Sequence, residues 1–551
     1  TRNQAHGSPA NLIDCYAAVD IPEIEGFGLT DFGIKGLRRD SIKTRPNYSD
    51  LSMLKYAPSA AHITGKPFTS SETFTWLTEH FRTSLSQLKP DLDLMFCAGV
   101  NHMFFHGTAY SPKDDPWPGW KFYASIDMSP TNSIWRDAPF LMQYITRCQS
   151  FLQWGKPDND FLVYLPIYNM WRRDTHHRLM QFSIESMAQR APKFIKDILN
   201  IVHLGYDCDY ISDRYLMGCT IAPDGSIQTA AGTRYKGIII PEGAILKPQI
   251  AEKLKTLAKD DPTRIMYGVH AKEMSLHASP EIMKADYGLK MIRRSNPSGY
   301  HYFIANLTPN DMDAFVPLAV HFKSATWFNP LNGNRYAAEI RKGKVHILLR
   351  SGESRILLTS DKVTTGTLPA EGPEEKAHLA DIDLTHQKWQ LSFIDEAPKV
   401  GETFQLDGLK TWENLDGKTR VTMGTGVYQT TFKLNRKQAS AHWNINLGDV
   451  RESARVYLNG QFIGCAWSVP FILNCKNALK KGKNTLRIEV TNLPANRIAD
   501  LDRKGVKWRK FKEINFVDIT YHQSSYAHWG PVPSGLNSTV RLQQATEQTG
   551  L

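Results

Sequence analysis

The sequence lacks the segments that mark membrane-spanning, metal-binding and redox domains. No run of about 18 consecutive apolar residues occurs, so no membrane-spanning helix is predicted. The seven cysteines form no CxxC pair and show no metal-ligand spacing, and their odd number prevents complete pairing into disulfides. We therefore expect most of the cysteines to be buried thiols.

Several common catalytic motifs are also missing. The chain contains no HExxH, no Walker loop and no GxSxG elbow, which disfavours zinc proteases, P-loop nucleotide hydrolases and α/β-hydrolases. The chain starts at Thr1 without an initiator methionine or an apolar signal segment, so we expect a processed or truncated product. The localisation must therefore be inferred from other features.

The charge is the first feature that points to a partner. The formal net charge of +11 favours an acidic partner, either nucleic acid or an anionic polysaccharide. No helix-turn-helix, zinc-finger or RNP motif is present, so nucleic acid is disfavoured. A solvated basic face is the simpler interpretation of the densest basic segment. Its basic residues are interleaved with Trp508 and Phe511 and are Arg497, Arg503, Lys504, Lys507, Arg509, Lys510 and Lys512.

The length of 551 residues exceeds what one hydrophobic core supports, so several domains are predicted. Residues 1–157 alternate short strands, such as Pro22–Gly26 and Phe68–Phe74, with helical segments. This pattern indicates a parallel sheet, either doubly wound or closed into a barrel. Only about four βα units are visible, whereas a complete (β/α)8 barrel needs roughly 250 residues. We therefore expect a partial barrel whose first strands precede Thr1.

The rest of the chain is predicted to contain one α/β domain and two β domains. Residues 158–263 form a Rossmann-like α/β domain, but no GxGxxG follows its first strand, so a dinucleotide is not expected. Residues 264–362 show a period of two, typical of a small antiparallel β domain. Residues 363–384, with Thr, Pro, Gly and Glu, form the clearest linker. Residues 385–545 contain strand patterns that favour a β-sandwich of the jelly-roll type.

Two predicted strands of the first domain carry glutamates at or near their ends. In the segment Asp20–Gly26, alternation places Glu23 and Glu25 on one face of the strand. Glu72 ends the next strand and is followed by Trp76, whose indole could stack on a sugar ring. Barrel enzymes carry catalytic groups at such strand ends, and glycosidic cleavage needs one protonated carboxyl group and one carboxylate. N-caps or surface charges explain this spacing equally well.

A polar and aromatic segment accompanies the predicted strand of residues 102–106. Such a segment suits a sugar site, because sugar hydroxyl groups need directional hydrogen bonds and sugar C–H faces stack on rings. A lone buried histidine is more often structural, so the indication comes from the whole segment. The candidate substrate-binding residues here are Asn101, His102, His106, Tyr110 and Trp120.

Six short segments occur in an order that is fairly specific, although each alone is weak. They are Gln4–Leu12, Asp20–Gly26, Ser71–Trp76, Asn101–Thr108, Ala495–Ile498 and Glu513–Phe516. This order resembles glycoside hydrolase family 106, the α-L-rhamnosidases, many of them from bacteria that degrade plant or algal polysaccharides. The terminal domain is also similar to the sugar-binding jelly roll of glycoside hydrolase family 2.

The resemblance implies an inverting glycosidase that releases terminal α-L-rhamnose from a plant or algal polysaccharide. By position, Glu23 would be the general acid and Glu72 the general base, with Asp20 and Glu25 in reserve. His6, in the first segment, would join the substrate-binding residues. Inversion requires the two carboxyl groups to lie about 6.5–9.5 Å apart, with a water between the base and the sugar.

The resemblance has further implications for metal and localisation. Calcium would be present at the active site in at least some members, but no compact ligand loop is visible and the metal ligands are unknown. A periplasmic or secreted location is implied. The first half of the family's barrel would precede this chain, so activity of the chain alone is an open question.

Two other interpretations stay open. A retaining β-galactosidase-like enzyme would carry out the same type of reaction and would differ in the anomer released first. A non-catalytic carbohydrate-binding protein would use the jelly roll of residues 385–545 and would form no product. In all three interpretations the partner is an oligosaccharide or polysaccharide.

Overall fold

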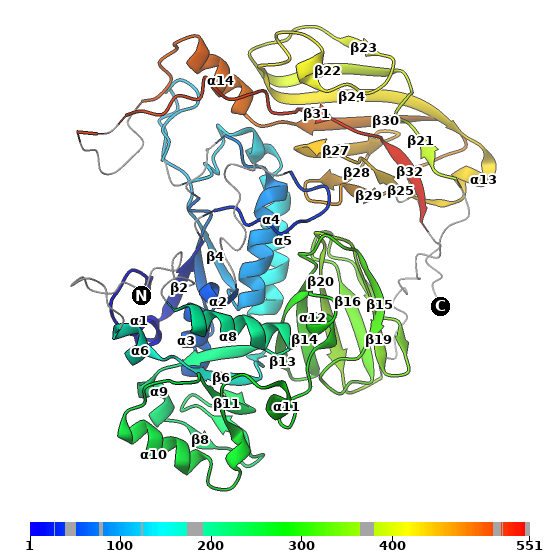
Figure 1. Ribbon diagram of the computed structural model, residues 1–551. Helices are drawn as coiled ribbons and strands as arrows, with labels where there is room; N and C mark the ends of the chain where they lie inside the picture. Colours follow the sequence, from blue (N-terminus) through cyan, green and yellow to red (C-terminus); the bar gives the residue numbers. More distant parts are fainter. Residues whose placement is uncertain are drawn as a thin grey trace.

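The computed structural model describes residues 1–26, 28–38, 51–76, 81–122, 125–172, 191–363, 380–475, 477–510, 519–520 and 522–545. The chain folds into four parts that follow one another along the sequence (Figure 1). The first two parts combine parallel strands with helices, and the last two are built from antiparallel strands. The predicted combination of α/β and all-β parts is therefore confirmed.

The first part is a four-stranded parallel sheet with helices. Its strands lie in the order β1 (Arg2–Asn3), β2 (Ile21–Glu25), β3 (Ser70–Thr73) and β4 (His102–Phe105). The helices are α1 (Leu12–Ala17), α2 (Leu51–Leu54), α3 (Tyr56–Thr64), α4 (Leu85–Ala98) and α5 (Ala138–Leu152). The predicted βα units are present. The sheet is open over the described residues, with β1 and β4 at its edges, and no closed barrel is found there.

Local sequence explains where two of these helices begin or end. The Asn11 side chain caps α1 by accepting a hydrogen bond from the backbone N–H of Ile13. Ser84 and Gln87 form a capping box at the start of α4. Gly99 follows α4 with a φ of 112°, in the left-handed region that favours glycine. Every residue of α4 is buried, so this helix lies inside the molecule.

The second part is another parallel sheet, in agreement with the predicted Rossmann-like layer. Its order is β12 (Ile265–Tyr267), β11 (Gly237–Ile240), β6 (Phe161–Tyr164) and β7 (Cys208–Ile211). The longest helices are α8 (Pro192–His203) and α10 (Pro248–Leu257). Strands β6, β7 and β11 are buried throughout, as expected for a parallel sheet that is covered on both faces.

The third part contains two antiparallel sheets around one core. The larger sheet consists of β17 (Arg335–Ala337), β16 (Ser324–Phe328), β20 (Ser354–Ser360), β14 (Gly299–Ala305), β13 (Lys290–Asn296) and β5 (Lys156–Pro157). The smaller consists of β15 (Met312–Val316), β19 (Lys344–Leu349) and β18 (Ile340–Arg341). Tyr302 and Ile347, from the two sheets, belong to the same buried cluster. The predicted period of two therefore corresponds to real strands.

The fourth part is a β-sandwich. One sheet consists of β23 (Phe404–Leu406), β22 (Trp389–Ala397), β24 (Met423–Leu434), β30 (Gly482–Thr491), β27 (Ser453–Leu458) and β28 (Gln461–Ala466). The other consists of β21 (Ile382–Asp383), β32 (Arg541–Ala545), β25 (His442–Asn446) and β29 (Ile472–Asn474), and β26 (Val450–Arg451) pairs with β31 (Gly535–Leu536). Residues of both sheets share one core. The jelly-roll connectivity stays a prediction, and most of the predicted linker, residues 364–379, lies outside the described residues.

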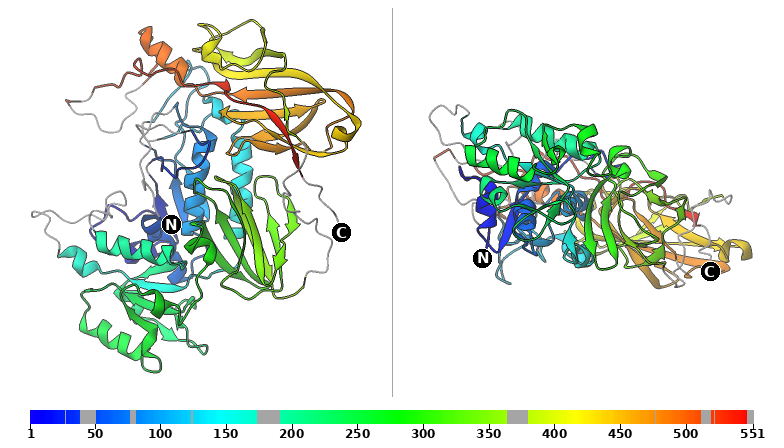
Figure 2. Two further views of the ribbon diagram at one scale, coloured as in Figure 1. Left: turned by 45° about the vertical axis from the view of Figure 1, so that its right-hand side comes forward. Right: turned by 90° about the horizontal axis from the view of Figure 1, so that it is seen from below.

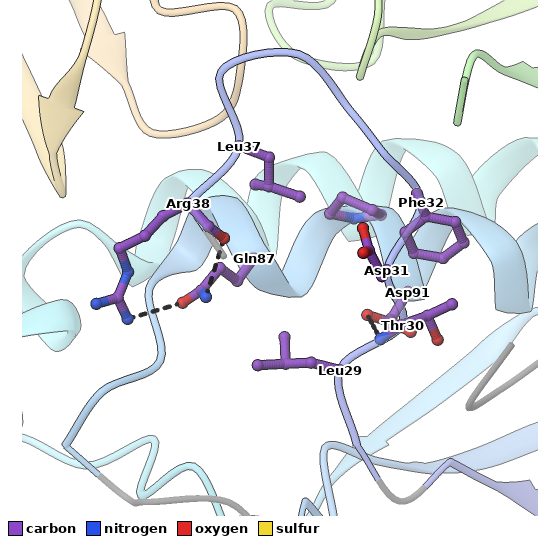
Figure 3. Close-up of a pocket in the computed structure, with 9 residues that line it drawn as sticks. Leu29, Thr30, Asp31, Phe32, Leu37, Arg38, Gln87 and Asp91 are labelled. Atoms are coloured by element: carbon purple, nitrogen blue, oxygen red, sulfur yellow. Dashed lines mark hydrogen bonds between the residues drawn. The ribbon is translucent and has the colours of Figure 1, made fainter. Parts of the chain in front are cut away.

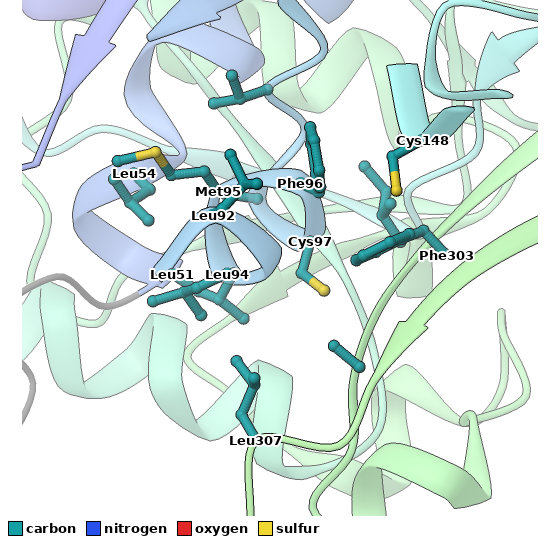
Figure 4. Close-up of a cluster of buried hydrophobic side chains, with 14 of the residues drawn as sticks. Leu51, Leu54, Leu92, Leu94, Met95, Phe96, Cys97, Cys148, Phe303 and Leu307 are labelled. Atoms are coloured by element: carbon teal, nitrogen blue, oxygen red, sulfur yellow. The ribbon is translucent and has the colours of Figure 1, made fainter. Parts of the chain in front are cut away.

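Helix α4 joins the first and third parts. In Figure 4, Leu92, Met95 and Phe96 of α4 lie in one apolar cluster with Phe303 and Leu307. The rings of Phe96 and Phe303 meet edge to face, with centroids 5.4 Å apart. In Figures 1 and 2 the sandwich and the second part lie at opposite ends of the molecule, with α4 and α5 between them. The first part therefore packs directly on the third part through α4.

Two predictions from composition can be checked against the fold. All seven cysteines are free, and five of them are buried, as expected for thiols that do not form disulfides. Among the described residues, no helix has the length and apolarity needed to cross a membrane.

Candidate active site

Three glutamates project from one face of the first sheet. Glu25 lies opposite Glu72 in the register of β2 and β3, and Ile24 lies opposite Ser71. Because side chains alternate along a strand, Glu23, Glu25 and Glu72 share one face. Ile24 and Ser71 occupy the other face and are fully buried. The alternation that the sequence predicted for the two glutamates of β2 is present.

Glu72 is the most accessible of the three. Its side chain is 28 % exposed, whereas those of the two glutamates of β2 are 6 % exposed. Gln4 Nε2 and Thr75 Oγ1 each donate a hydrogen bond to its carboxylate, at 2.7 Å. His106 Nδ1 lies 3.9 Å from the same carboxylate. Glu72 is therefore oriented by neutral donors and still open to a substrate or a water.

Glu23 lies deeper along β2. Its Oε2 accepts a hydrogen bond from Ser70 Oγ at 2.9 Å and lies 3.2 Å from Arg2 Nε. Burial raises the pKa of the Glu23 carboxyl, and the nearby charge of Glu72 raises it further, while Ser70 and Arg2 oppose the rise. The balance favours the protonated form more than in water.

Glu25 ends β2 and is paired with a histidine. His6 Nε2 lies 2.9 Å from Glu25 Oε2. Burial raises the pKa of Glu25, the hydrogen bond from His6 opposes the rise, and the charge of Glu72 adds to it. A general acid of a glycosidase needs a raised pKa. Both glutamates of β2 meet this requirement, so the pKa alone does not choose between them.

The strand register gives the approximate spacing of the carboxylates. Glu25 is directly opposite Glu72, so their Cα atoms are about 5 Å apart. Glu23 is two residues earlier on β2, which places its Cα about 8 Å diagonally from that of Glu72. Retention and inversion are distinguished by the separation of the carboxyl groups, about 5–5.5 Å against about 6.5–9.5 Å, and not by the Cα spacing. The carboxyl group of Glu25 is in hydrogen-bond contact with that of Glu72, which raises the pKa of Glu25.

Four of the predicted substrate-binding residues lie at or beyond the carboxyl ends of the strands. His6 and His106 flank the glutamates, and the His106 ring meets Phe122 edge to face, with centroids 5.2 Å apart. Tyr110, in the loop after β4, is 83 % exposed. Trp120 is half-buried in the same loop. These side chains stay candidates for contact with a sugar.

The structure places three other predicted residues away from the candidate site. Trp76 is fully buried and packs edge to face on Phe74, so its indole offers no free face to a sugar. Asn101 is buried, and its amide bonds to backbone groups. Asp20 precedes β2 and therefore lies at the amino ends of the strands, whereas Glu72 lies near their carboxyl ends. Trp76 and Asn101 therefore have structural contacts, and Asp20 lies away from the glutamates because of the direction of β2.

His102 is an intermediate case. It is the first residue of β4 and lies opposite Ser70, on the same face as Glu23. Its ring packs against Phe104 and Phe68, with centroids 4.7 and 5.4 Å away. Burial lowers the pKa of His102, so the neutral imidazole is favoured. His102 therefore has a packing role on the face of the sheet that carries the glutamates.

Asn101→Ala is expected to lower the free energy of unfolding by about 1–3 kcal/mol, because the buried backbone N–H of Thr69 and carbonyl of Pro67 would each lose a partner. Catalytic constants should be unchanged if the role of Asn101 is structural. Urea denaturation and steady-state kinetics on the same preparation check this. A normal unfolding curve combined with a large fall in kcat/KM would instead make Asn101 a substrate-binding residue.

Sequence reasoning missed the residues that hold the glutamates. Arg2, Gln4, Ser70 and Thr75 contact Glu23 or Glu72. For Ser70, the two-residue spacing from Glu72 was a usable signal, since both lie on one face of β3. For Arg2 and Gln4 the signal was the pairing of β1 with β2, which requires the fold.

The loop that follows β2 is held on α4 around a small pocket (Figure 3). The pocket is lined by Leu29, Thr30, Asp31, Phe32, Leu37, Arg38, Gln87, Pro90 and Asp91. The Thr30 backbone N–H donates to Asp91 at 3.4 Å, and Arg38 donates to Gln87 at 3.2 Å. Burial raises the pKa of Asp91 to about 8. The lining includes none of the three glutamates, so the pocket serves the anchoring of this loop.

The first part carries three glutamates on one face of an open parallel sheet, and an α/β part and two β parts follow it along the chain. Residues 39–285 match the family model of glycoside hydrolase family 106, described as alpha-L-rhamnosidase. This match confirms the resemblance that the sequence motifs indicated. It includes Glu72 and begins after Glu23 and Glu25. Residues 414–536 match the galactose-binding domain-like model of glycosyl hydrolase family 2.

Two known proteins show similarity to this chain, one in fold and one in sequence. The rhamnosidase from Novosphingobium sp. PP1Y has a similar fold, with a TM-score of 0.73 and 20 % identity, over 96 % of this chain and 52 % of that chain. A protein named "Putative beta-glucuronidase" from Formosa agariphila is 28 % identical over 210 residues, which are 37 % of this chain and 16 % of the relative. The chain thus spans about half of the rhamnosidase and a small share of the curated relative.

Proposed function

We propose that the protein is an α-L-rhamnosidase that releases terminal rhamnose from a plant or algal polysaccharide with inversion of configuration. The observation that carries the proposal is the set of glutamates on one face of β2 and β3, inside a fold similar to that of a rhamnosidase. The family match over residues 39–285 supports the same substrate class.

In this proposal Glu23 is the general acid and Glu72 the general base. The raised pKa of Glu23 keeps a proton available for the departing glycosidic oxygen. Glu72 removes a proton from a water, and this water attacks the anomeric carbon from the opposite side of the ring. The two residues are diagonal neighbours on β2 and β3, with Cα atoms about 8 Å apart, and inversion requires about 6.5–9.5 Å between their carboxyl groups.

The neighbours of Glu72 orient it for this role. Gln4 and Thr75 donate to both of its oxygens and hold the carboxylate plane in place. His106 lies beside the carboxylate at the carboxyl end of β4, within reach of a sugar hydroxyl group bound there. The exposed Arg2 and the buried Ser70 both contact the Glu23 carboxylate. Preorganised groups of this kind reduce the rearrangement needed in the transition state.

A retaining mechanism is the second candidate, because Glu25 lies directly opposite Glu72. In that case one carboxylate would attack the anomeric carbon and form a covalent intermediate. Proton NMR of the first rhamnose released distinguishes the two, since inversion of an α-rhamnoside gives the β-anomer first. Release of the α-anomer first would contradict Glu23 and Glu72 as the catalytic pair and would favour Glu25 as the partner of Glu72.

The pH profile identifies the general acid. Arg2 lowers the pKa of Glu23, so Arg2→Met should raise it and shift the basic limb of the kcat/KM profile to higher pH. His6 lowers the pKa of Glu25, so His6→Phe should shift the limb only if Glu25 is the acid. Steady-state kinetics across the pH range checks both variants. If the basic limb of the kcat/KM profile is unchanged in Arg2→Met but shifted in His6→Phe, the general acid is Glu25 and not Glu23.

Calcium and localisation come from the family resemblance alone. Calcium takes six to eight oxygen ligands. The described stretches of the chain contain no group of three or more acidic, histidine or cysteine side chains placed to hold a metal ion. Calcium at the active site stays part of the proposal, without named ligands, and the mechanism above routes no step through it. A periplasmic or secreted location fits a polysaccharide substrate and stays part of the proposal.

A further inference from the structure

A basic segment of the fourth part packs on loops of the first part. Between β30 and β31 the chain leaves the sandwich through helix α14 (Ala495–Arg503) and returns by residue 534. We refer to residues 495–510 and 522–534 as the basic excursion. Figures 1 and 2 show α14 lying over the loops of the first part, away from the body of the sandwich.

The basic excursion is anchored by an aromatic cluster. Trp508 and Trp529 of the excursion belong to one buried cluster with Phe81, which follows β3. Phe81 and Trp508 meet edge to face, with centroids 5.9 Å apart. Trp117, from the loop after β4, packs against the same cluster. The excursion is thus fixed on the first part by packing and has a defined position.

Charged contacts tie the excursion to the same two loops. The Arg497 guanidinium lies over the Trp117 ring, 3.9 Å from its centroid. Lys510 Nζ bonds to Asp115 at 2.9 Å. Arg82, in the segment after β3, lies over the Trp529 ring at 5.0 Å. Each contact joins the excursion to a segment that follows β3 or β4.

These two loops follow the carboxyl ends of β3 and β4, where the candidate catalytic residues lie. The segment after β3 begins next to Glu72, and the loop after β4 begins with His106. Gly107, next to His106, is bonded to Ser125 in both directions, which connects the start of this loop to its end. The excursion therefore forms a wall on the loops that follow the carboxyl ends of β3 and β4.

The wall is strongly basic. Residues 495–510 contain six basic and two acidic residues, a net charge of +4. Asp502 accepts a hydrogen bond from Trp508 and pairs with Arg509, so it is already used inside the wall. Arg503 and Lys507 are exposed and have no acidic partner among the described residues. Lys504 is exposed and pairs only with Asp500, four residues earlier.

We propose that the basic excursion binds acidic groups, carboxylate or sulfate, on the saccharide next to the rhamnose that is removed. This inference rests on the proposed glycosidase function and names its substrate class, an anionic polysaccharide. Exposed cations held at a fixed position attract an acidic chain. Because the wall is part of the β-sandwich chain segment, the fourth part contributes to the preference for an acidic saccharide.

The test uses two exposed lysines of the wall and two matched lysines elsewhere. Lys504→Gln with Lys507→Gln should weaken binding of oligogalacturonate and of sulfated dextran by about tenfold at low salt. Lys480→Gln with Lys481→Gln, at the other end of β30, removes the same charge and should change binding little. Isothermal titration calorimetry of the full chain gives the affinities, and 0.5 M salt should largely remove the difference.

The outcomes separate the inference from the function on which it rests. Equal losses in both double variants, or equally tight binding of neutral dextran, would overturn the role of the wall. Tighter binding of single-stranded DNA than of either acidic saccharide, with the same dependence on Lys504 and Lys507, would assign the wall to nucleic acid. Turnover of 4-nitrophenyl α-L-rhamnoside should be unchanged by all four substitutions. Absence of that turnover in the unmodified protein would contradict the rhamnosidase function without affecting the binding result.

Discussion

Glu72→Gln is expected to lower kcat for rhamnose release by about 10²–10⁴-fold, because the amide cannot accept a proton from the attacking water. The change keeps the size of the side chain, and one of the two donors, Gln4 or Thr75, keeps the remaining carbonyl oxygen as its acceptor. KM should therefore change much less than kcat. Steady-state kinetics with an aryl rhamnoside measures both constants.

A chemically matched control is available for this prediction. Glu252→Gln makes the same change on the exposed surface of α10, where Glu252 pairs only with Lys255. Its kinetics should equal those of the unmodified protein. Normal rhamnose release by Glu72→Gln would show that Glu72 is not the general base. A return of turnover with azide in place of water would support it, since a small anion needs no general base.

Arg293→Met is expected to lower the free energy of unfolding by about 3–5 kcal/mol. Arg293 is buried on β13 and pairs with three carboxylates, Asp158 at 2.5 Å, Asp160 at 2.9 Å and Glu281 at 2.9 Å. Methionine fills a similar volume but leaves these carboxylates without their cation. Chemical denaturation at pH 7 measures the loss.

The pH dependence gives this prediction a sign. Burial raises the pKa of Asp160 and of Glu281, and Arg293 opposes the rise. Without Arg293 both pKa values rise further, so the folded state binds protons more tightly than the unfolded state. The loss in free energy of unfolding caused by Arg293→Met should therefore be larger at pH 7 than at pH 5. Arg341→Met, at an exposed arginine of β18, should lose less than about 1 kcal/mol at either pH. A deficit independent of pH would contradict the ion-pair account.

Much of the fold could be predicted because it depends on local patterns. Alternating apolar strands and helices indicated the parallel sheets of the first two parts, and the period of two indicated the antiparallel strands after residue 264. Asn459 and Gly460 form the turn between β27 and β28, with both φ values positive, as an Asn-Gly pair favours. These features depend on neighbouring residues, so a single sequence contains them.

The candidate site was predictable only in part. The common face of Glu23 and Glu25 follows from alternation within one strand, which the sequence contains. The exposure of a side chain does not follow from it, and Trp76 is buried although its neighbours favoured a sugar-stacking role. The residues that orient Glu72 come from β1 and from the segment after β3, and their meeting depends on strand order.

The sequence by itself determined the succession of α/β and β parts, the glutamates of β2 and β3, and the resemblance to the α-L-rhamnosidases. The tertiary structure decided that Glu25 is directly opposite Glu72 while Glu23 is diagonal to it, because register is a property of two paired strands. It also decided that a basic segment near residue 500 lies on loops near residues 81 and 117. Contacts across nearly 400 residues arise from packing, and no local pattern encodes them.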